Sequence, residues 1–354
     1  MKKSMPKSLI YEYGTGKKGS ISMSDRYSPP FHLTDEIAEL SIEIGELIGM
    51  VSVNAGLSPD PRLRRENRIR TVYSSLAIEQ NTLSLDQVTD VIDGKRVLGP
   101  PKDIREVKNA YEAYERMSEF DPCSMEYLLT VHGLMTRDVT PESGRFRSGN
   151  VGVFQNGQLI HAGTPAAYVP EVMEQLFSWL RESTQHPLIK SCVFHYEFEF
   201  IHPFADGNGR TGRFWQSLIL QRWKPIFAWL PVETLIHEHQ TGYYEALNAA
   251  NSQGESTVFV AFMLSVIRDA LKEIRENQNR HVVKNVGKNV GKNVGKEDAV
   301  RMILRRQPHA TAKMIAEMTQ LSSRQVERIL AKLKQDGVLI RRGSRTNGWW
   351  EIRE

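Results

Sequence analysis

One short segment places the strongest constraint on the fold of this 354-residue chain. It runs from His202 to Arg213 and reads His-Pro-Phe-Ala-Asp-Gly-Asn-Gly-Arg-Thr-Gly-Arg. Gly207 and Gly209 flank Asn208, so the backbone amides there can turn inward and form a concave anion site. The helix that starts after them would add its positive end to the same site. The segment therefore predicts a phosphate-binding loop at the start of a helix.

The charged residues of this segment suit a polyphosphate and a metal ion. Arg210 and Arg213 are three residues apart, hence on one face of the helix, and their forked guanidinium groups suit phosphates. Asp206 would be costly beside phosphates unless a divalent cation joined its carboxylate to them. His202 adds a group that titrates near neutral pH. Together these residues predict a site for a nucleotide, Mg²⁺ and a general base.

A dinucleotide-binding turn is an alternative interpretation of the same glycines. Residues 207–212 satisfy the Gly-x-Gly-x-x-Gly fingerprint, and the alternating aromatic residues from Phe194 to Phe200 are typical of a preceding strand. Against it, Phe227 stands about 20 positions past the glycines, where that fold places an acidic residue, and the flanking pattern is helical. The local pattern disfavours this alternative without removing it.

The segment also resembles the signature of the Fic family, His-Pro-Phe-x-Asp-Gly-Asn-Gly-Arg-x-x-Arg, and matches all nine of its fixed positions. The resemblance implies a mainly α fold in which His202 ends one helix and the glycine loop opens the next, so that residues 194–200 are helical. It also implies a small β-hairpin flap around Phe146–Ala162, where Asn156 and Gly157 predict a tight turn. An adenosine-binding edge is implied at Tyr243, Tyr244 and Asn251.

The activity that this resemblance implies is protein adenylylation, the transfer of AMP from ATP to a Ser, Thr or Tyr hydroxyl of a target protein or of the enzyme itself. His202 would be the catalytic base, and Asp206 would hold Mg²⁺ on the phosphates. The other ATP-site positions implied are Val153 and Phe154 of the flap, which would also align the target, and Gly207, Asn208, Gly209, Arg210, Thr211, Gly212 and Arg213. Removal of AMP from a target, or transfer of another phosphate-linked group, is an alternative within the same class. A nucleotide-sensing DNA-binding regulator is the alternative from a different class.

A candidate inhibitory segment lies upstream of this core. The stretch from Ser75 to Glu79 resembles the inhibitory helix of family members in which that helix precedes the core. Glu79 would then reach the ATP site and pair with Arg213, which makes Ser75 and Glu79 inhibitory residues. Gln80 departs from the Gly or Asn that usually follows, which concerns the turn after the helix rather than the carboxylate.

Composition and periodicity predict a mostly helical, multi-domain protein. Hydrophobic residues make up 40% and charged residues 25%, which is close to the average for globular chains. Helices are expected at 35–53, 62–80, after the capping box Ser84–Gln87, and at 103–119, 124–135, 170–182 and 258–276. The predicted domains are an N-terminal helical region with the inhibitory helix (1–115), a Fic core (116–280), a flexible linker (281–296) and a winged helix-turn-helix (297–354).

Charge separates the last of these domains from the rest. Residues 281–354 hold 16 Lys and Arg against 7 Asp and Glu, a net charge of +9, whereas residues 1–280 carry −5. The tetrapeptide Lys-Asn-Val-Gly occurs three times from Lys284 onward and has little to pack, which predicts the flexible linker. The pattern after it, three helices and a hairpin, is typical of a winged helix. Such a fold would present Arg324, Gln325 and Arg328 to a DNA groove and Arg341, Arg342 and Arg345 to phosphates. A protein partner for this domain is an equal alternative.

The remaining signals concern location and metal binding. No stretch approaches the ~18 apolar residues of a membrane-spanning helix, and the N-terminus has no signal-peptide apolar region. Cys123 and Cys192 are too few for a disulfide framework. We therefore expect a cytoplasmic protein with no membrane partner, and the resemblance adds the expectation of a homodimer. His237 and His239 would point in different directions, which favours surface histidines over a metal site.

Overall fold

The computed structural model describes residues 27–54, 61–155, 158–228, 230, 232–289, 296–319, 321–343 and 348–353. The chain separates into two compact units, Met1–Lys272 and Glu273–Glu354. Unit 1 spans both the predicted N-terminal region and most of the predicted core; the domain boundaries drawn from the sequence stay predictions. None of the helices among the described residues is both long and apolar enough to cross a membrane.

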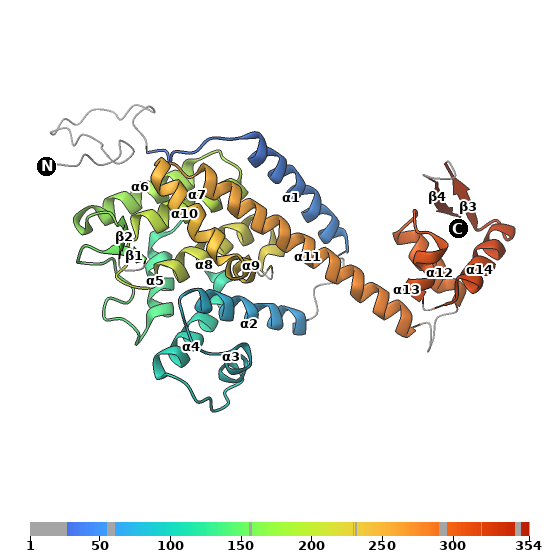
Figure 1. The fold of residues 1–354 in the computed structure, drawn as a ribbon, viewed down its shortest axis with the longest axis horizontal. Helices are drawn as coiled ribbons and strands as arrows, with labels where there is room; N and C mark the ends of the chain where they lie inside the picture. Colours follow the sequence, from blue (N-terminus) through green and yellow to red (C-terminus); the bar gives the residue numbers. More distant parts are fainter. Residues whose placement is uncertain are drawn as a thin grey trace. The chain divides into compact units, whose positions relative to one another are not determined.

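Unit 1 is built almost entirely of helices, with one two-stranded sheet (Figure 1). Its elements in chain order are α1 (Asp35–Asn54), α2 (Pro61–Ile78), α3 (Leu85–Ile92), α4 (Pro101–Glu115), η3 (Met117–Glu119), α5 (Met125–Thr136), β1 (Gly152–Gln155), β2 (Gln158–Ala162), η4 (Ala166–Tyr168), α6 (Val169–Glu182), α7 (Pro187–Ile201), α8 (Asn208–Trp223), η5 (Pro225–Ala228), α9 (Val232–Glu238), α10 (Gln240–Gln253) and the first part of α11 (Thr257–Asn289), which continues past the unit boundary at Lys272. The predicted mainly α fold class is confirmed.

Helix α7 lies at the centre of this unit and explains the ambiguous aromatic pattern. Phe194 and Phe198 share one face of the helix and Tyr196 projects from the opposite face, yet all three are buried. A helix that is apolar on all sides is enclosed by other elements. The alternation therefore reflects complete burial, and the strand that would precede a dinucleotide-binding turn is absent here, because residues 187–201 are helical.

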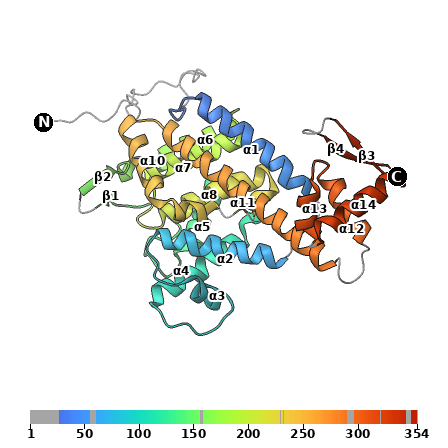
Figure 2. The ribbon, with the colours of Figure 1, turned by 45° about the vertical axis from the view of Figure 1, so that its right-hand side comes forward.

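Local signals set several helix ends as predicted. Ser84 and Gln87 form a capping box at the start of α3, in which the Ser84 hydroxyl accepts from the Gln87 amide and the Gln87 side chain accepts from the Ser84 amide. The β1–β2 hairpin is antiparallel and has an irregular register between Val153 and Phe154. It lies at one edge of unit 1 in both views (Figures 1 and 2). Its predicted turn at Asn156 and Gly157 lies outside the described residues.

The predicted flexible linker is wrong over its first part. Helix α11 continues to Asn289 and so includes residues 281–289 and the first Lys-Asn-Val-Gly repeat. A helix adds residues more easily than it nucleates, so a long preceding helix can carry weak helix formers such as Asn and Gly at its end. Residues 290–295, with most of the remaining repeats, lie outside the described residues.

Unit 2 has three short helices followed by a hairpin. These are α12 (Lys296–Arg306), α13 (Ala312–Thr319), α14 (Ser323–Gln335), β3 (Leu339–Arg342) and β4 (Trp349–Ile352). Their buried residues form one apolar cluster that includes Leu304, Ile315, Val326 and Trp350. The element order agrees with the sequence pattern, and the assignment as a winged helix-turn-helix stays a prediction.

Candidate functional site

The glycine-rich segment forms a tight loop between the two central helices. His202 follows the last residue of α7 and adopts a left-handed backbone conformation, with φ 53° and ψ 61°. Gly207 precedes the first residue of α8 with φ 83°. A non-glycine residue in this region costs about 1–2 kcal/mol, so the surrounding contacts must hold His202 in place. The helix ends predicted at this loop are confirmed by these bounds.

The loop is braced from inside by Asn208. Its Oδ1 accepts from the Phe204 amide at 2.9 Å, and its Nδ2 donates to the Phe204 carbonyl at 2.8 Å. The side chain is buried. The expected role of Asn208 in cradling phosphate is therefore restricted to its backbone. A Cβ at Gly207 would lie 2.8 Å from Thr136 Cγ2, so this position requires glycine for space as well as for φ.

His132, on α5, supports the same loop from outside and was not singled out from the sequence. Its Nδ1 accepts from the Gly144 amide at 3.0 Å, so Nε2 carries the proton and donates to the Asp206 carbonyl at 2.9 Å. The ring stacks on Phe204 with centroids 3.6 Å apart. Burial lowers the pKa of His132 to about 4, which keeps the ring neutral and able to donate and accept at once.

Glu79 and Ser75 meet Arg213, as the sequence predicts. Arg213 Nη2 donates to Glu79 Oε1 at 2.8 Å and to the Ser75 carbonyl at 2.9 Å, and Nε donates to Ser75 Oγ at 3.3 Å. The Arg213 side chain is 1% exposed. Burial alone would lower the pKa of Arg213, but the Glu79 carboxylate raises it, and the net direction is upward. The guanidinium charge is thus neutralised by a carboxylate from the turn that follows α2.

The Glu79 carboxylate also lies directly against the anion loop. A Cβ at Gly209 would overlap Glu79 Oε1 and would lie 2.9 Å from Arg213 Nη1. Gly209 is therefore required here to let α2 approach the start of α8. The carboxylate stands where the loop and the helix dipole are best arranged to receive an anion.

Arg210 does not face the loop interior as a free phosphate ligand. Its Nη1 donates to Glu106 Oε1 at 2.9 Å and its Nη2 to Asp206 Oδ1 at 3.0 Å. Its side chain is 5% exposed. Both terminal nitrogens bind carboxylates in this arrangement, and the role of Arg210 as a phosphate ligand stays a prediction. Glu106, on α4, was missed because nothing local in the sequence links two residues 104 positions apart.

Asp206 has the character expected of a shared Mg²⁺ ligand. Its side chain is 44% exposed, and Oδ1 accepts from the Gly207 amide at 2.6 Å as well as from Arg210. No group of three or more His, Cys, Asp or Glu able to enclose a metal occurs among the described residues. Mg²⁺ commonly binds through one or two carboxylates together with substrate phosphates, and a single exposed Asp beside an anion loop fits that mode.

The expected adenosine edge is only partly arranged as predicted. Tyr243 is buried, and its hydroxyl bonds with His195 Nε2 at 3.1 Å, so it packs inside rather than forming an open edge. Tyr244 is 38% exposed and remains accessible for stacking. Asn251 lies on the same helix, α10, and its buried Oδ1 has no hydrogen-bond partner among the described residues.

Glu199, on α7, is a second carboxyl group near Arg213 that was not predicted. A Cβ at Gly212 would lie 2.7 Å from its Oε1, which is buried and has no hydrogen-bond partner in the described part of the chain. Burial raises the pKa of Glu199 to about 8; Arg213 opposes this shift and Glu79 adds to it. Burial thus favours the neutral acid form of Glu199, which reduces its repulsion with Glu79. Thr211 is buried in the first turn of α8, where its hydroxyl donates to the Gly207 carbonyl.

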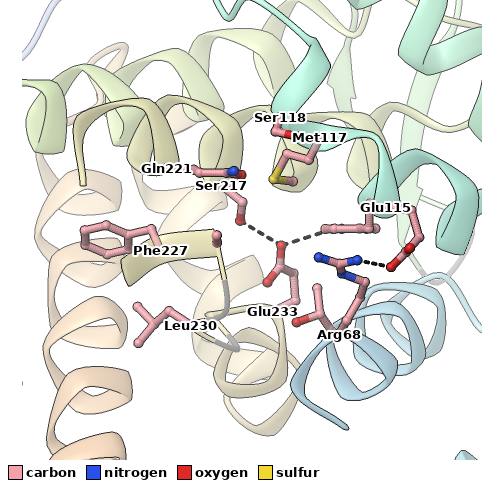
Figure 3. A pocket seen from close by; sticks show the side chains of 12 residues that line it. Arg68, Glu115, Met117, Ser118, Ser217, Gln221, Phe227, Leu230 and Glu233 are labelled. Atoms are coloured by element: carbon pink, nitrogen blue, oxygen red, sulfur yellow. Dashed lines mark hydrogen bonds and ion pairs between the residues drawn. The ribbon is translucent and has the colours of Figure 1, made fainter. Parts of the chain in front are cut away.

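A separate cavity of about 50 Å³ lies between α2, α4, α8 and the η5–α9 segment (Figure 3). Glu233 Oε1 accepts there from Ser217 Oγ at 2.8 Å and from the Tyr114 hydroxyl at 3.0 Å. Burial raises the pKa of Glu233. Ser75 also interacts with the Tyr114 hydroxyl, so polar contacts extend from the cavity to the Arg213 cluster. The volume is that of one or two water molecules and is too small for a nucleotide.

The other candidates are structural. His239 Nδ1 bonds with the Leu235 carbonyl at 3.0 Å, and His237 packs edge-on against Tyr73. Burial raises the pKa of the Cys192 thiol to about 12, which makes it unreactive. Val153 and Phe154 lie on β1, as predicted, but their side chains lie outside the described part of the structure.

Comparison with known proteins agrees with this geometry. Residues 122–220 match the model of the Fic/DOC family. The chain is similar to the crystal structure of a Fic family protein from Desulfovibrio desulfuricans G20, with 43% identity and a TM-score of 0.70 over 92% of this chain and 98% of that one. It is similar to the structure of Fic-1 (residues 134–508) from Caenorhabditis elegans, with 26% identity and a TM-score of 0.58 over 69% of this chain and 74% of that one.

Curated relatives are named for an activity. The chain is 33% identical over 219 residues to "Protein adenylyltransferase fic-1" of C. elegans, which covers 57% of this chain and 40% of the relative. It is 29% identical over 226 residues to "Protein adenylyltransferase Fic" of Nematostella vectensis, with 60% and 50% covered. The chain thus spans half or less of the length of these two relatives. The signature loop, the helical core and the similarity along nearly the whole of a solved Fic protein show that the chain belongs to the Fic family.

Proposed function

We propose that this protein is an adenylyltransferase that moves AMP from ATP to a Ser, Thr or Tyr hydroxyl of a target protein and of itself. The observation that carries the proposal is the loop between α7 and α8, which brings His202, Asp206 and the glycine backbone to the start of α8. The names of the curated relatives support the same reaction.

In the proposed reaction, His202 takes the proton of the target hydroxyl, and the hydroxyl oxygen attacks the α-phosphorus of ATP. The new O–P bond forms as the bond to the β-phosphate oxygen breaks, and pyrophosphate leaves with the electron pair. The backbone of Gly207, Asn208 and Gly209 and the N-terminus of α8 stabilise the phosphate charge. A positioned base contributes on the order of 10²–10⁴-fold to such a step.

Asp206 would hold Mg²⁺ against the phosphates, and the ion would neutralise part of their charge. The exposed Asp206 side chain supports this assignment. Arg213 would bind the γ-phosphate once Glu79 no longer occupies it. Arg210 would act through Asp206, because its guanidinium already binds that carboxylate. The flap would align the target segment through strand-style pairing with β1 near Val153 and Phe154.

We further propose that Glu79 inhibits the enzyme. The pair with Arg213 is 2.8 Å long, and the carboxylate lies against Gly209. It thereby removes the guanidinium from the γ-phosphate and adds a negative charge where the phosphates must lie. Both effects oppose productive ATP binding.

Incubation of the full chain with α-³²P-ATP and Mg²⁺ tests the proposed activity. We expect label on the protein, and no label with γ-³²P-ATP, because the γ-phosphate leaves with pyrophosphate. His202→Ala should bind ATP but fail to become labelled, and His239→Ala serves as a matched surface control. Binding of ATP by every variant with no label on any of them, including Glu79→Gly, would favour the nucleotide-sensing alternative. Release of AMP from a labelled target would favour the reverse reaction.

We also propose that unit 2 binds nucleic acid. Arg324 and Arg328 are exposed on α14, in a segment whose net charge is +9 from residue 281 onward. The wing residues contribute less than predicted, because Arg342 pairs with Glu351 at 2.6 Å and Arg341 lies over the Trp350 ring. Gln325 is used in a capping box with Ser322, and Arg345 lies outside the described residues.

Binding of the full chain to duplex DNA should weaken steeply with salt, because phosphate contacts release counterions. The double variant Arg324→Gln, Arg328→Gln should reduce both the affinity and the salt slope. A salt-insensitive or absent interaction would favour a protein partner. Cytoplasmic location and homodimer formation stay predictions.

A further inference from the structure

Arg147 stands out as a buried arginine that the proposed reaction does not use. It lies between α5 and β1, and it is 3% exposed. Its Nε donates to the His202 carbonyl at 2.7 Å, and its Nη1 donates to the Gly149 carbonyl at 2.8 Å. Its Nη2 donates to the carbonyls of Thr164 and Ile201. One side chain therefore joins the end of α7 to both sides of the hairpin stem.

The backbone around Arg147 follows the same connections. The Arg147 amide donates to the Pro203 carbonyl at 3.1 Å, and the Thr164 amide donates to the Ile201 carbonyl at 3.3 Å. A Cβ at Gly163 would lie 3.2 Å from Arg147 Nη2 and 3.4 Å from His202 Cβ. The stem of the flap is thus packed directly against His202, and glycine at 163 leaves the space for it.

The charge of Arg147 is compensated in an unusual way. In the part of the chain that the structure describes, no carboxylate forms an ion pair with it, and its side chain donates to backbone carbonyls. Burial lowers its pKa. The carbonyls of Ile201 and His202 belong to the C-terminal end of α7, which carries the negative end of the helix dipole and favours a cation. Only a guanidinium has enough donors in a fixed fork to reach four carbonyls on three segments.

We infer that Arg147 is a positioning residue that fixes His202 relative to the flap on which the target segment binds. The inference rests on the proposed function for its catalytic readout. Arg147 holds the strained left-handed backbone of His202 and sets its distance from β1 and β2. A target that binds along the flap therefore affects the position of His202 through the Arg147 side chain. Nucleotide binding, by contrast, depends on the opposite end of the loop, at Gly207 to Arg213.

The test uses the full chain in the Glu79→Gly background, with Arg147→Lys as the main variant. Lysine keeps the charge but cannot bridge the four carbonyls. We expect the rate constant of self-modification at saturating ATP to fall about 10- to 100-fold, as misplacement by about 1 Å does, while ATP affinity by calorimetry changes less than twofold. Arg145→Lys is the matched control, because Arg145 is exposed and its side chain donates to the nearby Pro141 carbonyl. It should leave both quantities unchanged.

Rescue by guanidinium separates positioning from general folding. In Arg147→Gly, low millimolar guanidinium should restore part of the rate, whereas methylammonium should not. A variant that had merely lost stability should show no such gain in rate, because low millimolar guanidinium is far below the molar concentrations that change stability. Absence of rescue, with ATP affinity lost in parallel with the rate, would contradict the inference.

A readout without catalysis keeps the inference separate from the proposed function. Amide hydrogen exchange of the full chain should rise in Arg147→Lys at residues 149–152, 163–164 and 201–204, and should be unchanged in α1 and in α9. If no variant becomes labelled, the proposed function fails, but this exchange pattern still decides whether Arg147 holds the flap stem to His202. Unchanged exchange in these segments would overturn the inference.

Discussion

Glu106 and Arg210 form a buried ion pair in which the carboxylate serves two partners. Glu106 Oε1 accepts from Arg210 Nη1 at 2.9 Å, and Oε2 accepts from Asn81 Nδ2 at 3.0 Å. Asn81 follows the turn that ends α2, where Gln80 has φ 65°. One carboxylate on α4 therefore links the segment that positions Glu79 with the arginine that holds Asp206.

Replacement of Glu106 by Gln should destabilise the protein by about 1–3 kcal/mol. A glutamine side chain has one oxygen acceptor in place of two, so it can accept from Arg210 or from Asn81 but not from both. The remaining donor then faces the NH₂ group and is left buried without an acceptor. The free energy of unfolding from urea titration measures this loss. Glu112→Gln, on the same helix, should change it by less than about 1 kcal/mol, because Glu112 pairs with Arg137 at the surface. Equal losses of unfolding free energy in the two variants would show that the Glu106–Arg210 pair does not stabilise the protein.

Replacement of Glu79 by Gly should raise self-modification about 10- to 100-fold at saturating ATP and Mg²⁺. A close ion pair in a partly buried site is worth on the order of a few kcal/mol, and each 1.4 kcal/mol corresponds to a factor of ten. Glu79→Asp should activate less, because a shorter carboxylate still pairs in part. Arg213→Ala should not activate, since it removes the γ-phosphate ligand together with the pair. Parent-level labelling of Glu79→Gly would mean that Glu79 is only a helix residue.

Replacement of Asp206 by Ala should leave a low rate that no longer responds to Mg²⁺. The proposed ligand is lost, and Arg210 retains only Glu106 among its two carboxylates. Labelling measured across a Mg²⁺ titration gives the dependence, and Asp138→Ala, an exposed Asp with a weak surface pair, is the control. A parent-like Mg²⁺ response would place the ion elsewhere.

Glu197 should contribute a loss of stability as the pH rises from about 4.5 to 7. Burial raises the pKa of Glu197 from 4.5 to about 7, against the hydrogen bond that Tyr27 donates at 2.5 Å. In this window the folded protein keeps a proton that the unfolded chain has released, so the folded state binds more protons and loses stability with rising pH. The full change is of the order of 3 kcal/mol.

Glu197→Gln should remove this contribution and leave those of Glu199 and His132 in place. The variant should gain in free energy of unfolding, relative to the parent, between pH 5 and pH 8, and urea titrations at both values measure it. Glu126→Gln, which alters an exposed carboxyl group, should show the parent's difference between the two pH values. A parent-like difference in Glu197→Gln would assign the pH response to other groups, among which Glu199 is the first to examine.

Short-range signals account for the parts of the fold that the sequence predicted well. The glycine loop, the helix that opens after it and the capping boxes at Ser84 and Ser322 depend on residues within a few positions of one another. The pairing of Glu79 with Arg213 spans 134 positions and became predictable only through the resemblance to a family. The residue types alone predicted the loop, the helix start and the caps, whereas the Glu79–Arg213 pair also required the family resemblance.

The contacts that the sequence did not reveal are those between distant polar residues. Glu106, Arg147 and His132 look like ordinary helix or loop residues, and their partners are a distant arginine or backbone carbonyls. Backbone acceptors leave no trace in a residue pattern. The linker prediction rested on the local composition of residues 281–296. It did not include the length of the preceding helix, α11, which continues to Asn289.

Gly209 lies so close to Glu79 that even a Cβ on Gly209 would overlap the carboxylate oxygen. Under the proposed inhibition, Glu79 and a bound phosphate would compete for this small volume, and Glu79 would be a tethered competitor of ATP. Its local concentration is set by the geometry of α2 and does not fall when the protein is diluted. Dilution should therefore leave the inhibited fraction unchanged, and only a shift of α2 or a higher ATP concentration can alter it.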